Sequence, residues 1–428
     1  MADRAKIVVT GAGALCAAGK DPAQIWETVR AGRSALSPIR QWDTTDWPRR
    51  IAGEIADLDP VALLKDRKIQ KFIRRSDVFG LYAADQAIEA SSICAYRETL
   101  GEAAAAAFSD RTGVYVGSGG GTYQSQYDYF PLLTAADGEL KRFGAELGDT
   151  VNPMWLLQTL PNNVLGHVGI RHGLKGPNAC ITNHSVSGML AIVEAMESLR
   201  QGEADRAVAV GHDAPIEPQV ILYYHRAGLL AEERIRSFDA RRDGSVFGEG
   251  GAALVLETEV SAAGRGATAL GELLGAACTS DAQGLLAIRE DGAALTDAIR
   301  GALEDARLAP SDVGMIVAHA NGTRQSDASE AAAILQVFGT AVPPVTGFKW
   351  AFGHLIAASG IIETVQALWA FREHTVPGIA TLRELDPAFA QLPASAAPRA
   401  PRGDVALIVS RGFGGINAAL LIRAAASR

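Results

Sequence analysis

The sequence has few of the residues that mark disulfide-rich or metal-binding scaffolds. Its 428 residues include four cysteines, which lie far apart and form no Cys-x-x-Cys pair: Cys16, Cys94, Cys180 and Cys278. A disulfide framework and a zinc knuckle are therefore not expected. The eight histidines do not cluster with acidic or thiol partners at metal spacings, so no metal site is predicted. Reduced thiols are expected, which favours a cytoplasmic protein.

Excess positive charge and a long apolar run are also missing. Lys and Arg number 40 against 48 Asp and Glu, a net charge of −8, which provides no general attraction for nucleic acid or acidic lipid. The opening residues MADRAKIVVT lack the apolar core and cleavage site of a signal peptide. Glu363 interrupts the longest apolar stretch, residues 355–371. Nucleic-acid binding, secretion and membrane spanning are therefore disfavoured.

Short β-branched runs alternate with longer helical patterns, which is typical of an α/β protein. The two halves also resemble each other, because VYVGSGGG and later MIVAHANG each read as a strand that ends in a glycine-containing turn. We interpret this as a duplicated core, with a first half over residues 1–257 and a second over 258–428. Chance similarity between any two α/β segments is the alternative at this point. The strands are expected at residues 6–10, 113–117, 206–210, 252–256, 314–318, 344–347, 405–410 and 418–422.

One segment departs from the acidic average. Residues 65–75 carry one acidic and six basic residues, a net charge of +5, which leaves the rest of the chain at −8 − 5 = −13. A solvated helix face is one interpretation, and a docking site for an acidic partner is the other. The six basic residues are Lys65, Arg67, Lys68, Lys71, Arg74 and Arg75.

Four polar clusters follow predicted strands, where the side chains would lie at the mouth of an α/β sheet. The first is NHSVSG, in which Ser185 opens a helical pattern and faces its free N–H groups, although an ordinary helix cap is the commoner role for a serine at such a position. The second is VAHANGT, with His319 at a strand end. The third, GFKWAFGH, contains Lys349 and His354. The fourth, SRGFGG, is a glycine-rich bend at Phe413 and Gly414 with backbone N–H groups for an oxyanion.

Taken in order, these clusters resemble the β-ketoacyl-acyl-carrier-protein synthases, the elongating condensing enzymes of the thiolase-fold superfamily. The resemblance covers essentially the whole chain, from IVVTGAGAL through GPNACITNHSVSG and RSFDARRDGSVFGEGGAALVLE to GFKWAFGHLIAASG and SRGFGGINAAL. It implies a duplicated five-layer αβαβα thiolase-like fold. It also implies a homodimer, or a heterodimer with an active synthase, with no cofactor beyond the phosphopantetheine that arrives on the acyl carrier protein.

The resemblance places the family's Cys-His-His triad on Ser185, His319 and His354, so a serine stands where the acyl-accepting cysteine normally does. It places Lys349 before the second histidine and pairs it with Glu330. Cys180, five residues before Ser185, is expected to be a buried strand residue instead of a substitute nucleophile.

The remaining family positions concern the substrate. Asn321 and Thr323 correspond to two threonines that contact phosphopantetheine. Phe413 corresponds to a gating phenylalanine, whose N–H joins that of Ser185 in an oxyanion hole. The basic segment 65–75 falls where elongating synthases dock the acidic carrier protein.

The serine changes the expected chemistry, because a hydroxyl is a poor nucleophile without an adjacent base. We expect His354 or His319 to take the Ser185 proton, and His184 to point elsewhere along the turn. The oxygen ester that results is less electrophilic than a thioester, so slow condensation is expected. The two neutral histidines would still stabilise the enolate formed by decarboxylation.

Four hypotheses follow: a β-ketoacyl synthase with a serine nucleophile, an acyltransferase or malonyl decarboxylase on the same scaffold, a non-catalytic partner subunit like the chain-length factors, or a serine introduced to trap a complex. Other classes fit poorly. Gly11-Ala12-Gly13 has Cys16 where a dinucleotide loop needs its third glycine. A serine hydrolase would need G-x-S-x-G, and position 183 is Asn.

Overall fold

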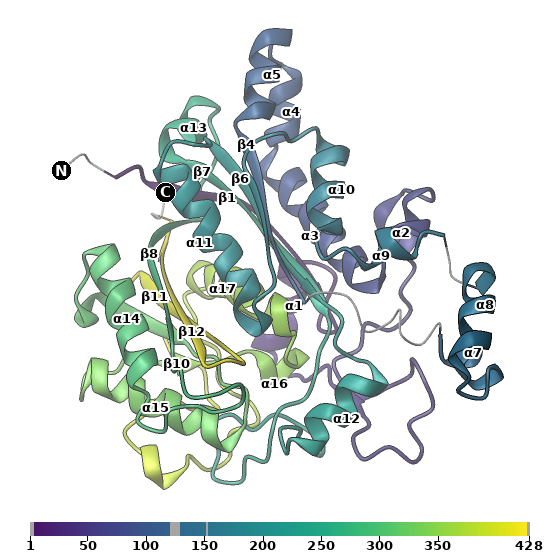
Figure 1. Ribbon diagram of the computed structural model, residues 1–428. Helices are drawn as coiled ribbons and strands as arrows, with labels where there is room; N and C mark the ends of the chain where they lie inside the picture. The colour runs from purple at the N-terminus through teal and green to yellow at the C-terminus, as the bar shows by residue number, and fades with distance from the viewer. Residues whose placement is uncertain (1–3, 120–128, 151–152, 426–428) are drawn as a thin grey trace.

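The structure is a computed structural model that describes residues 4–119, 129–150 and 153–425. Ten strands form one sheet in the order β10-β9-β11-β12-β8-β1-β7-β6-β4-β5 (Figure 1). The strands of the first half are β1 (Ile7–Cys16), β4 (Thr112–Ser118), β5 (Asn178–Ile181), β6 (Arg206–Asp213) and β7 (Gly250–Thr258). Those of the second half are β8 (Gly271–Ser280), β9 (Val313–Val317), β10 (Val345–Thr346), β11 (Val405–Gly412) and β12 (Ile416–Ala424).

The strand order shows that the fold is duplicated. The first half runs β5-β4-β6-β7-β1 and the second runs β10-β9-β11-β12-β8, so strands at the same place along each half occupy the same place in the sheet. The halves meet where β1 pairs with β8 over three residues, Ile7 to Val9. The expected duplicated α/β fold is thus confirmed. The predicted division at residue 257 falls at the end of β7 and stays a prediction.

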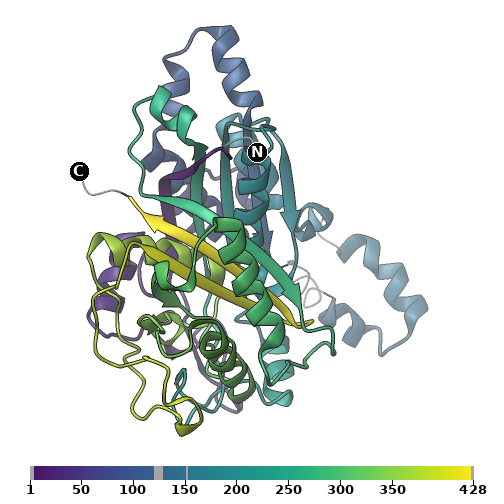
Figure 2. The same cartoon turned by 90° about the vertical axis from the view of Figure 1, so that its left-hand side faces the viewer.

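Two helices lie between the sheet halves and form the central layer. They are α11 (Ser187–Arg200) and α17 (Ser359–Arg372), which contact each other and strands of both halves. α3 (Arg75–Ser91) and α10 (Asn163–His172) cover the outer face of the first half, and α14 (Ala293–Ala306) and α15 (Arg324–Phe338) cover that of the second (Figure 2). Helix, sheet, helix, sheet and helix make the expected five layers.

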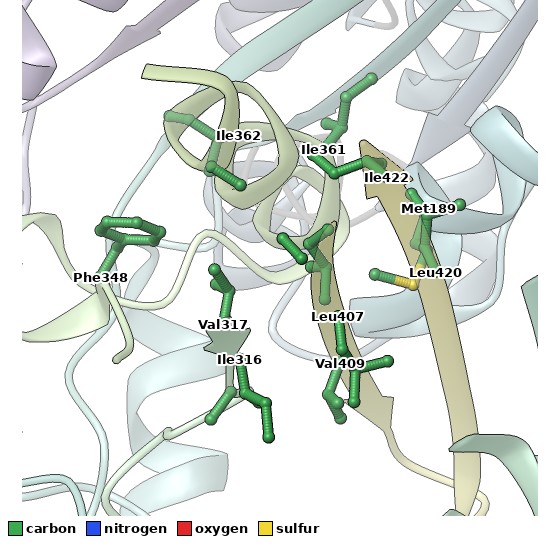
Figure 3. Close-up of a cluster of buried hydrophobic side chains, with 14 of the residues drawn as sticks. Met189, Ile316, Val317, Phe348, Ile361, Ile362, Leu407, Val409, Leu420 and Ile422 are labelled. Carbon is green, nitrogen blue, oxygen red and sulfur yellow. The ribbon is translucent and has the colours of Figure 1, made fainter. Parts of the chain in front are cut away.

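The largest hydrophobic cluster lies around the central helices. Figure 3 shows Met189 of α11 and Ile361 of α17 among side chains of β11 and β12, including Leu407 and Leu420. The interrupted apolar stretch of the sequence is α17, which is buried along almost its whole length because it lies between the two halves of the sheet. No helix in the described part of the chain is long and apolar enough to cross a membrane.

Shorter elements surround this core. A small sheet pairs β2 (Ser37–Pro38) with β3 (Ile51–Ala52). The remaining helices are α1 (Pro22–Arg30), α2 (Pro60–Leu64), α4 (Ile93–Glu98), α5 (Glu102–Asp110), α7 (Phe130–Ala135), α8 (Leu140–Thr150), α9 (Trp155–Thr159), α12 (Pro218–Arg226), α13 (Glu259–Gly264) and α16 (Lys349–Phe352). Single 3-10 turns are η1 (Ile69–Lys71), η2 (His184–Val186), η3 (Pro310–Asp312), η4 (Ile356–Ala358) and η5 (Pro387–Phe389).

Candidate active site

The polar clusters meet in one cavity of about 380 Å³ at the carboxyl ends of the parallel strands. β5 leads to the turn with Ser185, β9 to His319, β10 to the segment with His354, and β11 to Phe413. Parallel strands place their carboxyl ends at the same edge of a sheet, which is where α/β proteins bind ligands. The lining includes Ser185, His319, Asn321, Thr323, His354 and Phe413.

The central helices begin in matching turns that bring the two halves together. η2 precedes α11 and η4 precedes α17. In each turn a serine accepts a backbone hydrogen bond four residues back, Ser187 from the Asn183 N–H and Ser359 from the Leu355 N–H. The helix starts lie so close that a Cβ on Gly188 would sit 2.5 Å from the Ala357 carbonyl oxygen. Only glycine permits this approach, which brings the Ser185 turn next to His354.

His354 is oriented as a proton donor toward Ser185. Its Nδ1 accepts the Ile356 N–H at 3.0 Å, so the proton of the neutral ring lies on Nε2. Nε2 faces the Ser185 hydroxyl at 3.5 Å. Burial disfavours the charged ring and holds the pKa of His354 well below its ordinary value, an effect that the nearby Lys349 reinforces. His354 is therefore a neutral donor.

His319 has the same protonation pattern. Its Nδ1 accepts the Arg411 backbone N–H at 3.3 Å, which leaves the proton on Nε2. Burial lowers its pKa well below the usual value, with Lys349 adding to the effect. The two histidine rings lie 5.1 Å apart, centroid to centroid, at 77°. Two neutral N–H donors thus serve the same cavity. This geometry corrects the expectation that either ring takes the Ser185 proton, because Nε2 of each already carries one.

Lys349 and Glu330 hold the His319 segment in place, but not as a pair. Lys349 Nζ lies 2.6 Å from both the His319 carbonyl oxygen and Glu363 Oε1, and Lys349 and Glu363 are fully buried. The carboxylate of Glu330 accepts the N–H groups of His319 and Ala320 at 2.6 and 2.9 Å. The expected pairing of Lys349 with Glu330 is therefore wrong. Both oxygens of Glu330 are occupied by backbone donors, and Glu363 supplies the counter-charge from α17.

His184 is the site residue that the sequence interpretation missed. Its backbone has φ = +50°, a left-handed conformation rare for a non-glycine residue, and this turns the ring back toward Ser185. Nδ1 of His184 lies 2.9 Å from Ser185 Oγ, closer than His354. The expectation that His184 points elsewhere is thus overturned. Its position beside Ser185 was visible in the sequence, but the backbone conformation that aims it was not.

The glycine-rich bend contributes one backbone donor to the cavity. The Phe413 N–H points at His184 Nδ1 at 3.3 Å, and the Phe413 and His184 rings stack at 4.4 Å with 10° between their planes. The Gly414 N–H instead donates to the Leu285 carbonyl at 2.8 Å. Gly414 is therefore not an oxyanion donor, because its φ of +81° turns its N–H toward the neighbouring loop.

Asn321 and Thr323 form a polar wall of the same cavity. The Asn321 side-chain oxygen accepts from both the N–H and the hydroxyl of Thr323 at 3.0 Å. Thr323 also caps α15 by accepting the Ser326 N–H at 3.4 Å. The pair thus joins the helix start to the cavity entrance.

The basic segment divides into exposed and enclosed residues. Lys65, Arg67, Lys68 and Lys71 are exposed, whereas Arg74 and Arg75 are half-buried. Arg75 donates to the buried carboxylate of Glu249 and to the Ile55 carbonyl. Arg75 thus supplies the counter-charge that the buried Glu249 needs, and the docking role predicted for Arg75 stays a prediction. The exposed four remain candidates for docking.

Cys180 is part of β5, as the sequence indicated, but it is half-buried and not buried as expected. Its thiol donates to the Pro161 carbonyl at 3.3 Å, and burial raises its pKa, so the thiol form is favoured. A protonated thiol engaged in this way is not a nucleophile.

Solved structures define the class of protein. A ketosynthase/chain length factor from the ishigamide system matches with a TM-score of 0.86 and 26% identity, covering 99% of this chain and 100% of that one. A type II polyketide ketosynthase solved with its acyl-carrier protein, AntDE:AntF, matches with a TM-score of 0.80 and 25% identity over 99% and 100%. Fold and site together define a thiolase-fold condensing enzyme.

The family follows from the sequence comparisons. The model of the β-ketoacyl synthase N-terminal domain matches residues 4–262, and that of the C-terminal domain matches residues 270–383. The 3-oxoacyl-[acyl-carrier-protein] synthase 2 of Synechocystis is 33% identical over 98% of both chains. The chain belongs to the β-ketoacyl synthase family and is an acyltransferase of the 3-oxoacyl synthase type.

Proposed function

We propose that the protein catalyses decarboxylative condensation of malonyl carrier protein with an acyl group held on Ser185. The single observation that carries this proposal is the convergence of the Ser185 hydroxyl with the two neutral donors, His354 and His319, in one buried cavity. The synthases and carrier-protein complex described above are relatives of the same family, which supports acyl carrier protein as the substrate.

The first step would be acyl transfer. Ser185 Oγ attacks the thioester carbonyl carbon, the carbon–sulfur bond breaks, and the carrier thiol leaves with a proton. Malonyl carrier protein then loses carbon dioxide, and the Nε2–H groups of His319 and His354 donate to the oxygen of the enolate. The enolate carbon attacks the Ser185 ester, forming the new carbon–carbon bond and releasing the serine oxygen, which regains a proton.

Intact-mass spectrometry tests this sequence of steps. Incubation with an acyl carrier protein should add one acyl mass to the protein at Ser185, and later addition of malonyl carrier protein should release a 3-oxoacyl product two carbons longer. Absence of any acyl adduct would overturn the proposal. An adduct that is never extended would instead support the second candidate, an acyltransferase or malonyl decarboxylase. The observation that favours this second candidate is the orientation of His319 and His354. Backbone N–H groups of Arg411 and Ile356 hold the two rings, so their N–H donors stay in place without an acylated serine.

We propose that the exposed residues Lys65, Arg67, Lys68 and Lys71 dock the acidic carrier protein. Reversing charge in the Lys68→Glu/Lys71→Glu variant should lower kcat/KM for acyl carrier protein by about 10-fold at low salt, since electrostatic steering changes association rates by that order. Acylation by a small acyl-pantetheine thioester should not change. Steady-state kinetics with both substrates measures this difference.

The matched control reverses two exposed arginines elsewhere, Arg33→Glu/Arg300→Glu, with the same change in net charge. This variant should keep its kcat/KM for the carrier protein. Equal losses in both variants would mean that overall charge, and not the basic segment, governs docking.

We propose a dimer as the working form, with a second copy of this chain on the outer face of β5. β5 is an edge strand of the sheet. Within the described residues, α9 and α10 expose large apolar side chains, including Leu156 and Ile170, which are 60% and 78% exposed. α10 contacts β5, and exposed apolar side chains beside a sheet edge are typical of a protein interface. An alternative partner is a homologous subunit, as in the ketosynthase/chain length factor relative.

Sedimentation velocity should give a mass of about 90 kDa, twice the chain mass of 44.9 kDa. The Leu156→Glu/Ile170→Glu variant should shift it toward the monomer, because charges would be buried in the interface. A purified chain that stays monomeric until a homologous subunit is added would favour the heterodimer. We also propose a cytoplasmic location, in keeping with four unpaired cysteines.

A further inference from the structure

We infer that His184 is the general base that activates Ser185, with Tyr224 as its supporting partner. This inference rests on the proposed function, since it concerns acylation of the same serine. His184 lies between the two hydroxyls: Nδ1 is 2.9 Å from Ser185 Oγ, and Nε2 is 2.6 Å from Tyr224 Oη. Both contacts are short enough for strong hydrogen bonds.

The protonation pattern of the three histidines selects His184. A backbone N–H always donates, so the Phe413 N–H fixes His184 Nδ1 as an acceptor, with the ring proton on Nε2. That acceptor nitrogen is the one that faces Ser185. His354 and His319 present Nε2–H groups to the cavity and have no free lone pair there. Of the three imidazoles, only His184 offers the hydroxyl an acceptor.

Stacking holds the His184 ring in this orientation. It is parallel to the Phe413 ring, and the Tyr224 ring of α12 stacks on Phe413 at 5.2 Å. Tyr224 also meets Phe247 edge-on at 4.7 Å. When Nδ1 gains the serine proton, Nε2–H can donate to Tyr224 Oη, which stabilises the imidazolium as an orienting partner does in other serine–histidine pairs.

The same contact couples proton transfer to the oxyanion donor. Nδ1 has one lone pair, which the Ser185 hydroxyl and the Phe413 N–H share at 2.9 and 3.3 Å. When the serine proton moves onto Nδ1, this nitrogen no longer accepts hydrogen bonds. The Phe413 N–H is then free to donate to the oxygen of the tetrahedral intermediate. Proton transfer from Ser185 to His184 thus also releases the Phe413 N–H to act as the oxyanion donor.

Burial lowers the pKa of His184 to about 4, so the ring is neutral and ready to accept a proton at neutral pH. A base of low pKa gives a smaller rate gain than one with a pKa near 7. The expected effect of removing it therefore lies near the lower end of the usual range for general bases.

The test measures the rate of Ser185 acylation by intact-mass spectrometry with an acyl-pantetheine thioester. His184→Ala and His184→Gln should each slow acylation by about 100-fold, because neither side chain can take the proton. Free imidazole should restore part of the rate in His184→Ala. Tyr224→Phe keeps the ring stack but loses the hydroxyl, and should slow acylation by a smaller factor.

A second background separates base catalysis from a structural role. A thiolate needs no base at the moment of attack, so adding His184→Ala to Ser185→Cys should slow acylation by less than about 10-fold. An equal loss in both backgrounds would assign His184 a structural role and overturn the inference, as would normal acylation of His184→Gln. If the unaltered protein forms no adduct at all, it is the proposed function that fails.

Discussion

Replacing Ser185 with alanine should abolish the acyl-enzyme and lower condensation by at least about 1,000-fold, since loss of a covalent nucleophile has effects of this size or larger. Malonyl decarboxylation should persist. In the proposed reaction the enolate oxygen accepts from His319 and His354, whose orientations depend on backbone N–H groups of Arg411 and Ile356 and not on the serine. Intact mass reports the adduct, and carbon dioxide release reports the decarboxylation.

Two further variants test the donor and the alternative nucleophile separately. His354→Ala should lower decarboxylation by about 100-fold, which is the usual effect of removing one preorganised donor. Cys180→Ser should leave both reactions unchanged, because that thiol is engaged with the Pro161 carbonyl in β5. An acyl adduct that survives Ser185→Ala but disappears in Cys180→Ser would move the nucleophile to residue 180.

Replacing Ser185 with cysteine should raise the condensation rate by about 100-fold, because a cysteine has an appreciable thiolate fraction near neutral pH and sulfur is the better nucleophile. Two physical changes act in the same direction. A thiol at a helix start ionises more readily than a hydroxyl, and the acyl group then rests on a thioester, which a carbon nucleophile attacks more easily. Steady-state condensation assays measure the gain.

The cysteine variant also decides between an enzyme and a partner subunit. It should become sensitive to iodoacetamide, and acyl carrier protein should protect it. Ser187→Cys is the matched control, since Ser187 lies two residues away and its hydroxyl is used by the Asn183 N–H and the His184 carbonyl. If Ser185→Cys forms a thioester but never extends it, the chain would not be a condensing enzyme.

Much of the fold was predictable because most strands carry their own apolar signature. The runs at residues 206–210, 252–256 and 405–410 all lie within longer observed strands. β8 was not predicted. Its sequence GELLGAACTS is rich in glycine and alanine, which have little strand preference, and it forms because β1 and β12 supply the pairing. Tertiary context therefore determined what local pattern did not indicate.

In the candidate site, too, some features followed from the sequence pattern and others depended on the tertiary structure. Ser185, His319, His354 and Phe413 were predicted to share a cavity, and the structure brings them together. The role of His184 was missed because it depends on a left-handed backbone angle, which sequence spacing does not reveal. The Lys349 partner was missed for another reason. Glu363 was noted only as an interruption of an apolar stretch, although a carboxylate within a buried helix requires a counter-charge.

The narrow junction between the sheet halves has a consequence for how the enzyme is built. Three residue pairs join β1 to β8, while the proposed nucleophile, Ser185, comes from one half and both proposed imidazole donors come from the other. Neither repeat by itself therefore carries a complete reaction centre.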